Sequence, residues 1–311
     1  MRVERRRRAP SVLPTETARA HILAVMMSVG VGITAAVAED LVAEPAPEWT
    51  ALFDREHDWT GADGIFSIPL NGREVGAGHD SESRTLILFS DTAIGEVGSA
   101  GERLEGTKLV NNTLAVLRGT APEPDRIEFF WGGRITSEPA AIFAPETPDA
   151  RDGEWYWLGD GVAIGDKVHI LVRPEAFTDF DAWRFWDGDG WSAQLDDASP
   201  ITDQISNELS VSPLADGRYI LVFHVGGITA DVGVRFGDSP VGPFGDIHTI
   251  YHTPEPSTDP ETFVYNAKAH PHLSRPGELL ISYNVNTFDF WGDFFRDADI
   301  YRPRFIRLKL E

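Results

Sequence analysis

The sequence contains no cysteine, which excludes disulfides, thiolate metal sites and a cysteine nucleophile. Basic residues are also scarce, since 27 lysines and arginines stand against 49 aspartates and glutamates, for a formal net charge of −22. A surface of that sign repels nucleic acid and anionic lipid, so we exclude both as partners. Stability must come from an apolar core, and a neutral or cationic substrate suits the charge.

Long amphipathic segments and two catalytic motifs are missing as well. No stretch after the first 38 residues keeps the apolar spacing of a long helix. The sequence has no Gly-x-Ser-x-Gly elbow and no phosphate-binding loop, which argues against serine hydrolases and nucleotide hydrolases.

The N-terminus has the organisation of a secretory signal peptide. A basic start, RVERRRRAP, precedes the apolar run HILAVMMSVGVGITAAVA, which ends in a small-residue pattern before Glu39. This order predicts residues 1–38 as a signal peptide cleaved after Ala38. We therefore expect a secreted, periplasmic or cell-envelope protein with no membrane insertion after cleavage. An uncleaved anchor is the alternative, because the run has the length of a short membrane span.

Short apolar runs separated by Gly, Asp, Asn and Pro fill the chain from Trp59 onward. Runs such as TLILF (85–89) and RYILVFH (218–224) have the length and composition of strands, and Gly in the intervening turns allows tight hairpins. The pattern predicts an all-β domain over residues 59–311, preceded by a Pro-containing lead-in at 39–58.

Hairpin groups recur loosely along this domain, at 59–95, 108–135, 154–175, 205–238 and 264–310. Five such modules predict a five-bladed β-propeller, which we expect to be a monomer. The terminal run RFIRLKL would then close the ring against the first blade. A β-sandwich of this size is the alternative.

Acidic residues next to apolar strands are the candidates for catalysis. A buried carboxylate is costly unless it is paired, so its place at the end of a strand calls for a reason. Glycoside hydrolysis uses two carboxyl groups, one as proton donor and one as base or nucleophile. We predict Asp63, Asp91 and Glu208 as catalytic candidates. For each, a turn, a cap or an exposed strand start is the structural alternative.

Polar residues in equivalent places of the modules are the expected substrate contacts. They share a position at the start or end of a predicted inner strand: Asn111, Asn112, Asp160, Asn207, Asn266, Lys268 and His270. The pair His270 and His272 lacks a third clear ligand, so we predict no metal site there.

A tryptophan-rich segment, DAWRFWDGDGW, contains Trp183, Trp186 and Trp191. Exposed indoles at a channel mouth would stack on sugar rings, whereas buried indoles would pack between blades. The DGDG stretch at 187–190 supplies oxygens for Ca²⁺ but lacks a full binding loop, so a solvated turn is favoured. We therefore predict no cofactor, with Ca²⁺ as the alternative.

Several motifs together resemble a known family. GADG, LILFSDTAIG, KLVNNTLAV and WYWLGDGVAIGDKVHIL are similar to the secreted propellers of domain of unknown function 4185. VRFGDSPVGPF resembles a turn common in glycoside hydrolase family 43 and similar five-bladed enzymes, and YNAKAHPHLSRPGELLISYNVN resembles their last-blade motif. The resemblance covers about residues 59–310.

This resemblance implies a five-bladed propeller with a carbohydrate site at its funnel. Some family members are endo-D-arabinanases of mycobacterial cell-wall glycans, and the setting of their proposed acid pair is similar to that of Asp63 and Asp91. The sequence departs from the family in Ser90, where Gly is usual, and in the extra segment GREVGAGHDSES.

Three hypotheses follow. The first is a secreted glycoside hydrolase that acts on a cell-envelope or environmental polysaccharide, with furanose sugars among the candidates. The second is a non-catalytic glycan-binding propeller, and the third is an acidic envelope scaffold. The first requires carboxyl groups about 5–5.5 Å apart for retention or about 6.5–9.5 Å apart for inversion.

Overall fold

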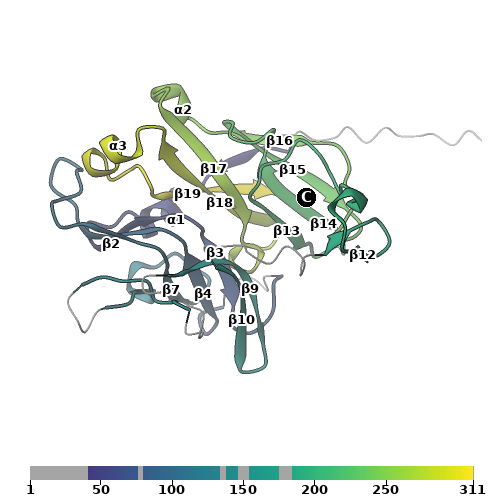
Figure 1. Cartoon of the computed structure of the whole chain (residues 1–311), viewed down its shortest axis with the longest axis horizontal. Coiled ribbons are helices and arrows are strands. Elements are labelled where there is room, and N and C mark those ends of the chain that lie inside the picture. The colour runs from purple at the N-terminus through teal and green to yellow at the C-terminus, as the bar shows by residue number, and fades with distance from the viewer. Residues whose placement is uncertain (1–40, 76–79, 134–137, 146–153, 175–183, 311) are drawn as a thin grey trace, which may run out of the picture. The chain divides into compact units, whose positions relative to one another are not determined.

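The computed structural model describes residues 41–75, 80–133, 138–145, 154–174 and 184–310 (Figure 1). The predicted signal peptide lies outside these residues, as does Trp183. Within the described ranges strands dominate and helices are short, which confirms the all-β prediction. None of the helices in these ranges has the length and apolar character that a membrane span requires.

The strands form six sheets in the described residues. The first half of the chain contributes β2 (His57–Ala62), β3 (Phe66–Pro69), β4 (Arg84–Phe89), β5 (Thr92–Glu96), β6 (Lys108–Val110), β7 (Thr113–Arg118), β8 (Ile127–Phe130), β9 (Tyr156–Ile164) and β10 (Lys167–Pro174). The second half contributes β11 (Phe185–Trp186), β12 (Trp191–Ser192), β13 (Leu209–Pro213), β14 (Tyr219–His224), β15 (Asp231–Gly237), β16 (His248–His252), β17 (Thr262–Ala269), β18 (Glu278–Thr287) and β19 (Pro303–Lys309).

The first two predicted modules are one structure. Three long strands each bend once, so that β2, β5 and β6 form one sheet and β3, β4, β7 and β8 form the next. The prediction of separate modules at 59–95 and 108–135 is therefore wrong. Apolar runs show where strands are, but they do not show which strands pair. We call these two sheets together the bent sheet.

The first and last described strands meet in another sheet, ordered β1-β19-β18-β17, which we call the closing sheet. Its edge strand β1 (Ala43–Pro45) belongs to the segment expected as a lead-in, and it pairs with β19. The terminal run thus lies between β18 and β1 rather than against the bent sheet. The folded part of the chain begins before Trp59.

Helix α1 (Pro47–Leu52) follows β1 and carries a buried apolar face. Its C-cap residue Phe53 stacks on Phe305 of β19 with ring centroids 5.3 Å apart. Trp59 lies between Phe89 and Phe129 of the bent sheet, with centroids 5.0 and 4.8 Å away. Rings this large dominate the apolar area of a core, so this cluster joins α1, the bent sheet and the closing sheet.

Four inner edge strands surround a central cavity of about 290 Å³. They are β3 of the bent sheet, β9 of the β9–β10 hairpin, β13 of the β13–β16 sheet and β17 of the closing sheet. Figure 1 shows these sheets arranged around the middle of the fold. Such a radial arrangement is typical of a β-propeller. The five blades of the prediction are not confirmed by the described sheets.

The remaining helices are short. They are α2 (Glu255–Thr258), α3 (Phe290–Arg296) and the 3₁₀ turns Pro124–Arg126, Leu195–Asp197 and Pro271–Leu273. Near α3 the buried Arg103 donates to the carbonyls of Phe294 and Ile300, at 2.8 and 3.0 Å. Because one buried side chain donates to carbonyls on both sides of residues 295–299, Arg103 fixes the loop that precedes β19.

Candidate active site

Three predicted residues form one cross-strand row at the bend of the bent sheet. The registers on either side, Ala62 opposite Thr92 and Thr92 opposite Val110, place Asp63 opposite Asp91 and Asp91 opposite Asn111. Asp63 N donates to the Asp91 carbonyl at 3.2 Å, and Asn111 Nδ2 donates to Asp91 Oδ1 at 3.3 Å. Opposite residues of an antiparallel pair share a face, so the two carboxylates are neighbours on one wall.

Gly64 makes this bend sterically feasible. Its φ is +90°, and a Cβ atom there would lie 2.7 Å from both the backbone N and the Oγ of Ser90. Gly64, the second Gly of the GADG motif, therefore allows both a left-handed backbone conformation and the close approach of the next strand.

Asp63 has the most perturbed carboxyl group of the row. Tyr265 donates its hydroxyl to Asp63 Oδ2 at 2.8 Å, whereas Oδ1 is buried without a hydrogen-bond partner. Burial and then the charge of Asp91 raise the pKa of Asp63 to about 7, against the lowering effect of the Tyr265 hydroxyl. Asp63 can therefore hold or release a proton near neutral pH.

Glu208 comes to the same place from a different sheet. It directly precedes β13 and its side chain is exposed. Its charge contributes to the raised pKa of Asp63 and opposes the lowering of the pKa of Lys268. The structure thus brings all three predicted carboxylates to one region. Burial also raises the pKa of Asp91, which Asn111 opposes.

A β-bulge in β17 sets the direction of two side chains. Tyr265 pairs with Asn284 and Lys268 with Ser282, so β17 spends one residue more than β18 between these pairs. The two residues of β17 at the bulge are Asn266 and Ala267, and the φ of Asn266 is +64°. Because the bulge shifts the alternation by one, Tyr265 and Lys268 lie on the same face of the strand.

Lys268 is 4 % exposed, and its Nζ has no hydrogen-bond partner. The ammonium lies 4.3 Å from the centroid of the Phe66 ring, a cation–π contact. Burial lowers the pKa of Lys268 to about 8, although the charges of Glu208, Asp63 and Asp160 oppose this. An unpartnered donor among three carboxylates is suited to a ligand hydroxyl.

Asp160 lines the central cavity together with Lys268. It occupies a second bulge, where Gly159 and Asp160 of β9 face the single residue Leu171 of β10. Its Oδ1 accepts from Gly161 N at 2.8 Å. Bulges next to functional sites re-aim side chains, and here the bulge lies on the strand that borders the cavity.

Two of the predicted substrate-binding side chains make their hydrogen bonds within the protein. Asn112 is fully buried and donates to the carbonyls of Phe143 and Tyr156, at 2.8 and 2.9 Å. His270 lies between the hydroxyls of Ser67 and Ser282, at 2.7 and 2.8 Å, and burial lowers its pKa to about 3. Both side chains hold strands in place.

The remaining predicted contacts differ in burial. Asn266 is buried and donates to Asn284 Oδ1 at 3.0 Å, while its own Oδ1 has no partner. Asn207 is exposed, next to Glu208. The role of each as a substrate contact stays a prediction.

Three further residues belong to the site and were not predicted. Tyr265 bonds Asp63, and Tyr301, at φ +72°, also lowers the pKa of Asp63 by hydrogen bonding. His224 is buried with Nε2 unpartnered, and burial lowers its pKa to about 4, so its ring is neutral. A hydrophobic strand ending in His, RYILVFH, was the available signal for His224.

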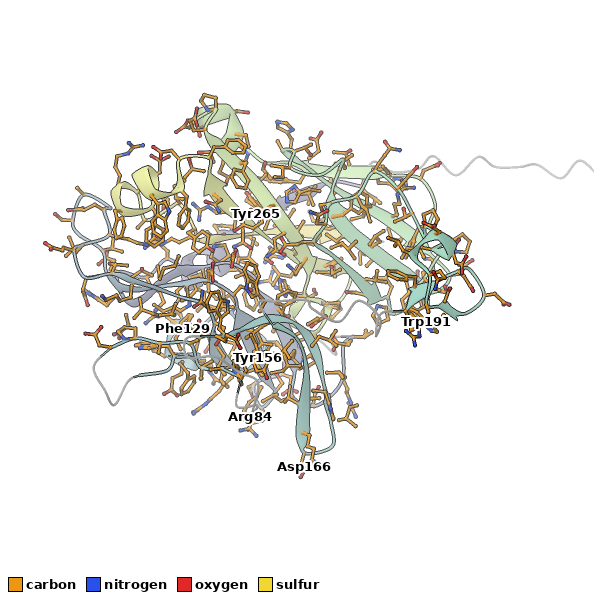
Figure 2. The ribbon with its side chains drawn as sticks, in the orientation of Figure 1. Arg84, Phe129, Tyr156, Asp166, Trp191 and Tyr265 are labelled. Atoms are coloured by element: carbon orange, nitrogen blue, oxygen red, sulfur yellow. The ribbon has the colours of Figure 1, made fainter. Side chains whose placement is uncertain are left out.

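Trp191, at the described end of the tryptophan-rich segment, lies away from these residues. Figure 2 shows Trp191 well apart from Tyr265. In the DGDG stretch, Asp187 Oδ1 accepts from Asp189 N and Gly190 N at 2.9 and 2.6 Å, as a solvated turn does. Among the described residues, no three His, Asp or Glu side chains are grouped closely enough to hold a metal.

Comparison with solved structures shows a similar fold. A proposed hydrolase from Bacteroides ovatus ATCC 8483 has a TM-score of 0.65 at 17% identity, covering 86% of this chain and 93% of the other. An α-L-arabinofuranosidase from Podospora anserina, solved with cellotriose, has a TM-score of 0.33 at 14% identity, covering 82% and 97%. A family 43 glycoside hydrolase from Bacillus licheniformis has a TM-score of 0.22 at 12% identity, covering 79% and 51%. The last two scores are too low to support an inference.

Comparison by sequence corrects the family. Residues 47–179 and 176–310 match the family described as Domain of unknown function (DUF5005). The predicted assignment to domain of unknown function 4185 is therefore wrong. No curated protein matches the chain.

Proposed function

We propose that this chain, which belongs to the family described as Domain of unknown function (DUF5005), is a secreted hydrolase of glycosidic bonds. The observation that carries the proposal is convergence. Asp63 lies between β2 and β3, Glu208 directly precedes β13, and Lys268 lies on β17 and lines the central cavity. Although they come from distant parts of the chain, the charges of Asp63 and Glu208 both act on the pKa of Lys268. Secretion rests on the signal-peptide pattern of residues 1–38.

Asp63 and Glu208 are the proposed reacting pair. The two carboxyl groups of a glycosidase flank the scissile bond. Asp63 and Asp91 are neighbours on one wall, whereas Glu208 approaches from the β13–β16 sheet. Asp63 donates the proton, and Glu208 acts as base or nucleophile. Asp91 adjusts Asp63 through its charge.

Lys268 and the cavity hold the sugar. The cavity lining includes Lys268, Asp160 and the serines Ser67, Ser210 and Ser212. Such a mixture of donors and acceptors is suited to the hydroxyl groups of a neutral sugar ring. The acidic cavity residues disfavour an anionic sugar.

The test is release of reducing ends from a panel of furanose and pyranose polysaccharides. We expect Asp63→Asn and Glu208→Gln each to lower the rate by about 10²-fold or more, because each removes a proton-transfer or nucleophilic group. Asp166→Asn, at the exposed β9–β10 turn, is the matched control and should retain activity (Figure 2). Full activity in both Asp63→Asn and Glu208→Gln would contradict the proposal.

The dependence of activity on pH distinguishes the role of Asp63 from that of Asp91. Wild-type activity should fall as the pH rises through about 7, because Asp63 then loses its proton. The charge of Asp91 helps to raise the pKa of Asp63, so Asp91→Asn should move this fall to lower pH. Binding without cleavage across the panel would instead favour a glycan-binding propeller.

A further inference from the structure

A row of aromatic side chains begins at the candidate carboxylates and ends at the surface. Phe263 pairs with Asn286 and Tyr265 with Asn284, and Phe288 N donates to the Glu261 carbonyl at 2.9 Å, which extends the ladder. Phe263, Tyr265 and Phe288 therefore lie on one face of the closing sheet. We call these three residues the aromatic stripe.

The rings of the aromatic stripe follow one another at contact distance. The centroids of Tyr265 and Phe263 are 5.6 Å apart, with 46° between the ring planes. Those of Phe263 and Phe288 are 4.8 Å apart, with 32° between the planes. Moderate tilts of this kind leave the rings as a continuous surface.

Exposure increases along the stripe. Tyr265 and Phe263 are half-buried, whereas Phe288 is 66 % exposed just beyond the end of β18. Asn286, opposite Phe263, lies beside the aromatic stripe, and its hydrogen bond opposes the raised pKa of Tyr265. A surface of aromatic faces with an amide beside them offers both stacking and hydrogen bonds.

The inner end of the aromatic stripe contacts a candidate catalytic carboxylate. The Tyr265 hydroxyl is 2.8 Å from Asp63 Oδ2. From Tyr265 to the position of Phe288, opposite Glu261, β17 advances four residues, or about 13 Å at strand rise. That length exceeds a single sugar ring, so a ligand on the stripe is a chain and not a monosaccharide.

From this geometry we infer that the aromatic stripe is a binding subsite for a neutral polysaccharide chain, which it leads from the surface to Asp63. Sugar rings stack their C–H faces on Phe288 and Phe263, and Asn286 bonds their hydroxyls. The inference rests on the proposed function, which makes Asp63 the point to which the polysaccharide is led. It adds that the substrate extends beyond the cavity, so the enzyme acts on polymers.

The test measures binding separately from cleavage. The full-length Asp63→Asn variant, which does not turn over under the proposed mechanism, is run in native gels containing arabinoxylan, linear arabinan or hydroxyethyl cellulose. We expect retardation in at least one gel, and a loss of affinity of about tenfold in the double variant with Phe288→Ala. Phe288→Tyr keeps the ring and should keep the affinity.

Leu195→Ala is the matched control, because Leu195 is 66 % exposed in the 3₁₀ turn Leu195–Asp197. It should not change the retardation. Equal retardation with and without Phe288→Ala would overturn the inference, and so would no retardation in any gel. Binding that depends on Phe288, with no cleavage by the wild type, would contradict the proposed catalysis but support the binding subsite.

Discussion

Lys268 has no hydrogen-bond partner for its Nζ, yet it is almost fully buried. A buried ammonium without a partner is unfavourable, and its lowered pKa reflects that penalty. Side chains held at a loss of stability are common where a ligand completes their contacts. Asp63 is in the same condition, with Oδ1 unpartnered and its pKa raised.

Replacing the lysine should stabilise the protein and inactivate it. The unfolded pKa of Lys268 is 10.5 and its folded pKa is about 8, so the folded state is penalised below pH 8 and the penalty vanishes above about 10.5. Lys268→Met should raise the free energy of unfolding at pH 6.5 by up to roughly 3 kcal/mol.

Thermal unfolding at pH 6.5 and 10.5 measures this, together with polysaccharide hydrolysis. Lys167→Met, at the exposed lysine that begins β10, is the control and should leave both nearly unchanged. A lower melting temperature for Lys268→Met at pH 6.5 would show that Lys268 stabilises the fold.

Two bulges determine what the inner strands present to the cavity. The bulge in β17 puts Tyr265 and Lys268 on one face, and the bulge in β9 contains Asp160. Each adds one residue to a strand that borders the cavity. The Asn at position 266 is suited to its bulge, because Asn adopts a positive φ at lower cost than most residues.

The bulge in β17 can be tested by two substitutions at one position. Asn266→Val introduces a β-branched side chain at φ +64° and should destabilise the protein by about 1–3 kcal/mol. It should also lower hydrolysis, since relaxing the bulge rotates Lys268 away from Asp63.

Asn266→Gly tolerates the same backbone and should retain more stability and activity than the valine variant. Chemical denaturation and initial rates provide the comparison. If the two variants were equally impaired, the lost bond to Asn284, and not the backbone, would be the role of Asn266.

At the scale of the whole molecule, the first and last described strands share one sheet. β1 forms the edge of the closing sheet beside β19, and α1 covers the aromatic core with Trp49, Leu52 and Phe53. The closing sheet also carries Tyr265, Lys268 and the aromatic stripe. The N-terminal segment and the site therefore depend on the same sheet.

A chain that begins at residue 59 should fail to fold. It lacks β1 and α1, so the edge of β19 and the ring of Phe305 become exposed. A chain that begins at residue 39 keeps every described residue and is the control. Circular dichroism during heating should show a cooperative transition for the control alone. A cooperative transition in both would make β1 and α1 dispensable.

Local chemistry alone determined much of this protein. Strand positions, the scarcity of helix and the hairpin turns at Gly165-Asp166 and Asp216-Gly217 follow from residue types a few positions apart. Asp63, Asp91 and Lys268 stood out because charged residues beside apolar strands require a reason.

Only the tertiary structure decided how these parts meet. The partner of Asp63 is Tyr265, 202 residues away, and Glu208 comes from the residue just before β13. Alternation along a strand does not reveal a bulge, so the direction of Lys268 was not predictable. Nor does composition distinguish His270, held by two serines, from a free ligand. Pairing, burial and side-chain direction depend on contacts between distant residues, and a sequence pattern records only neighbours.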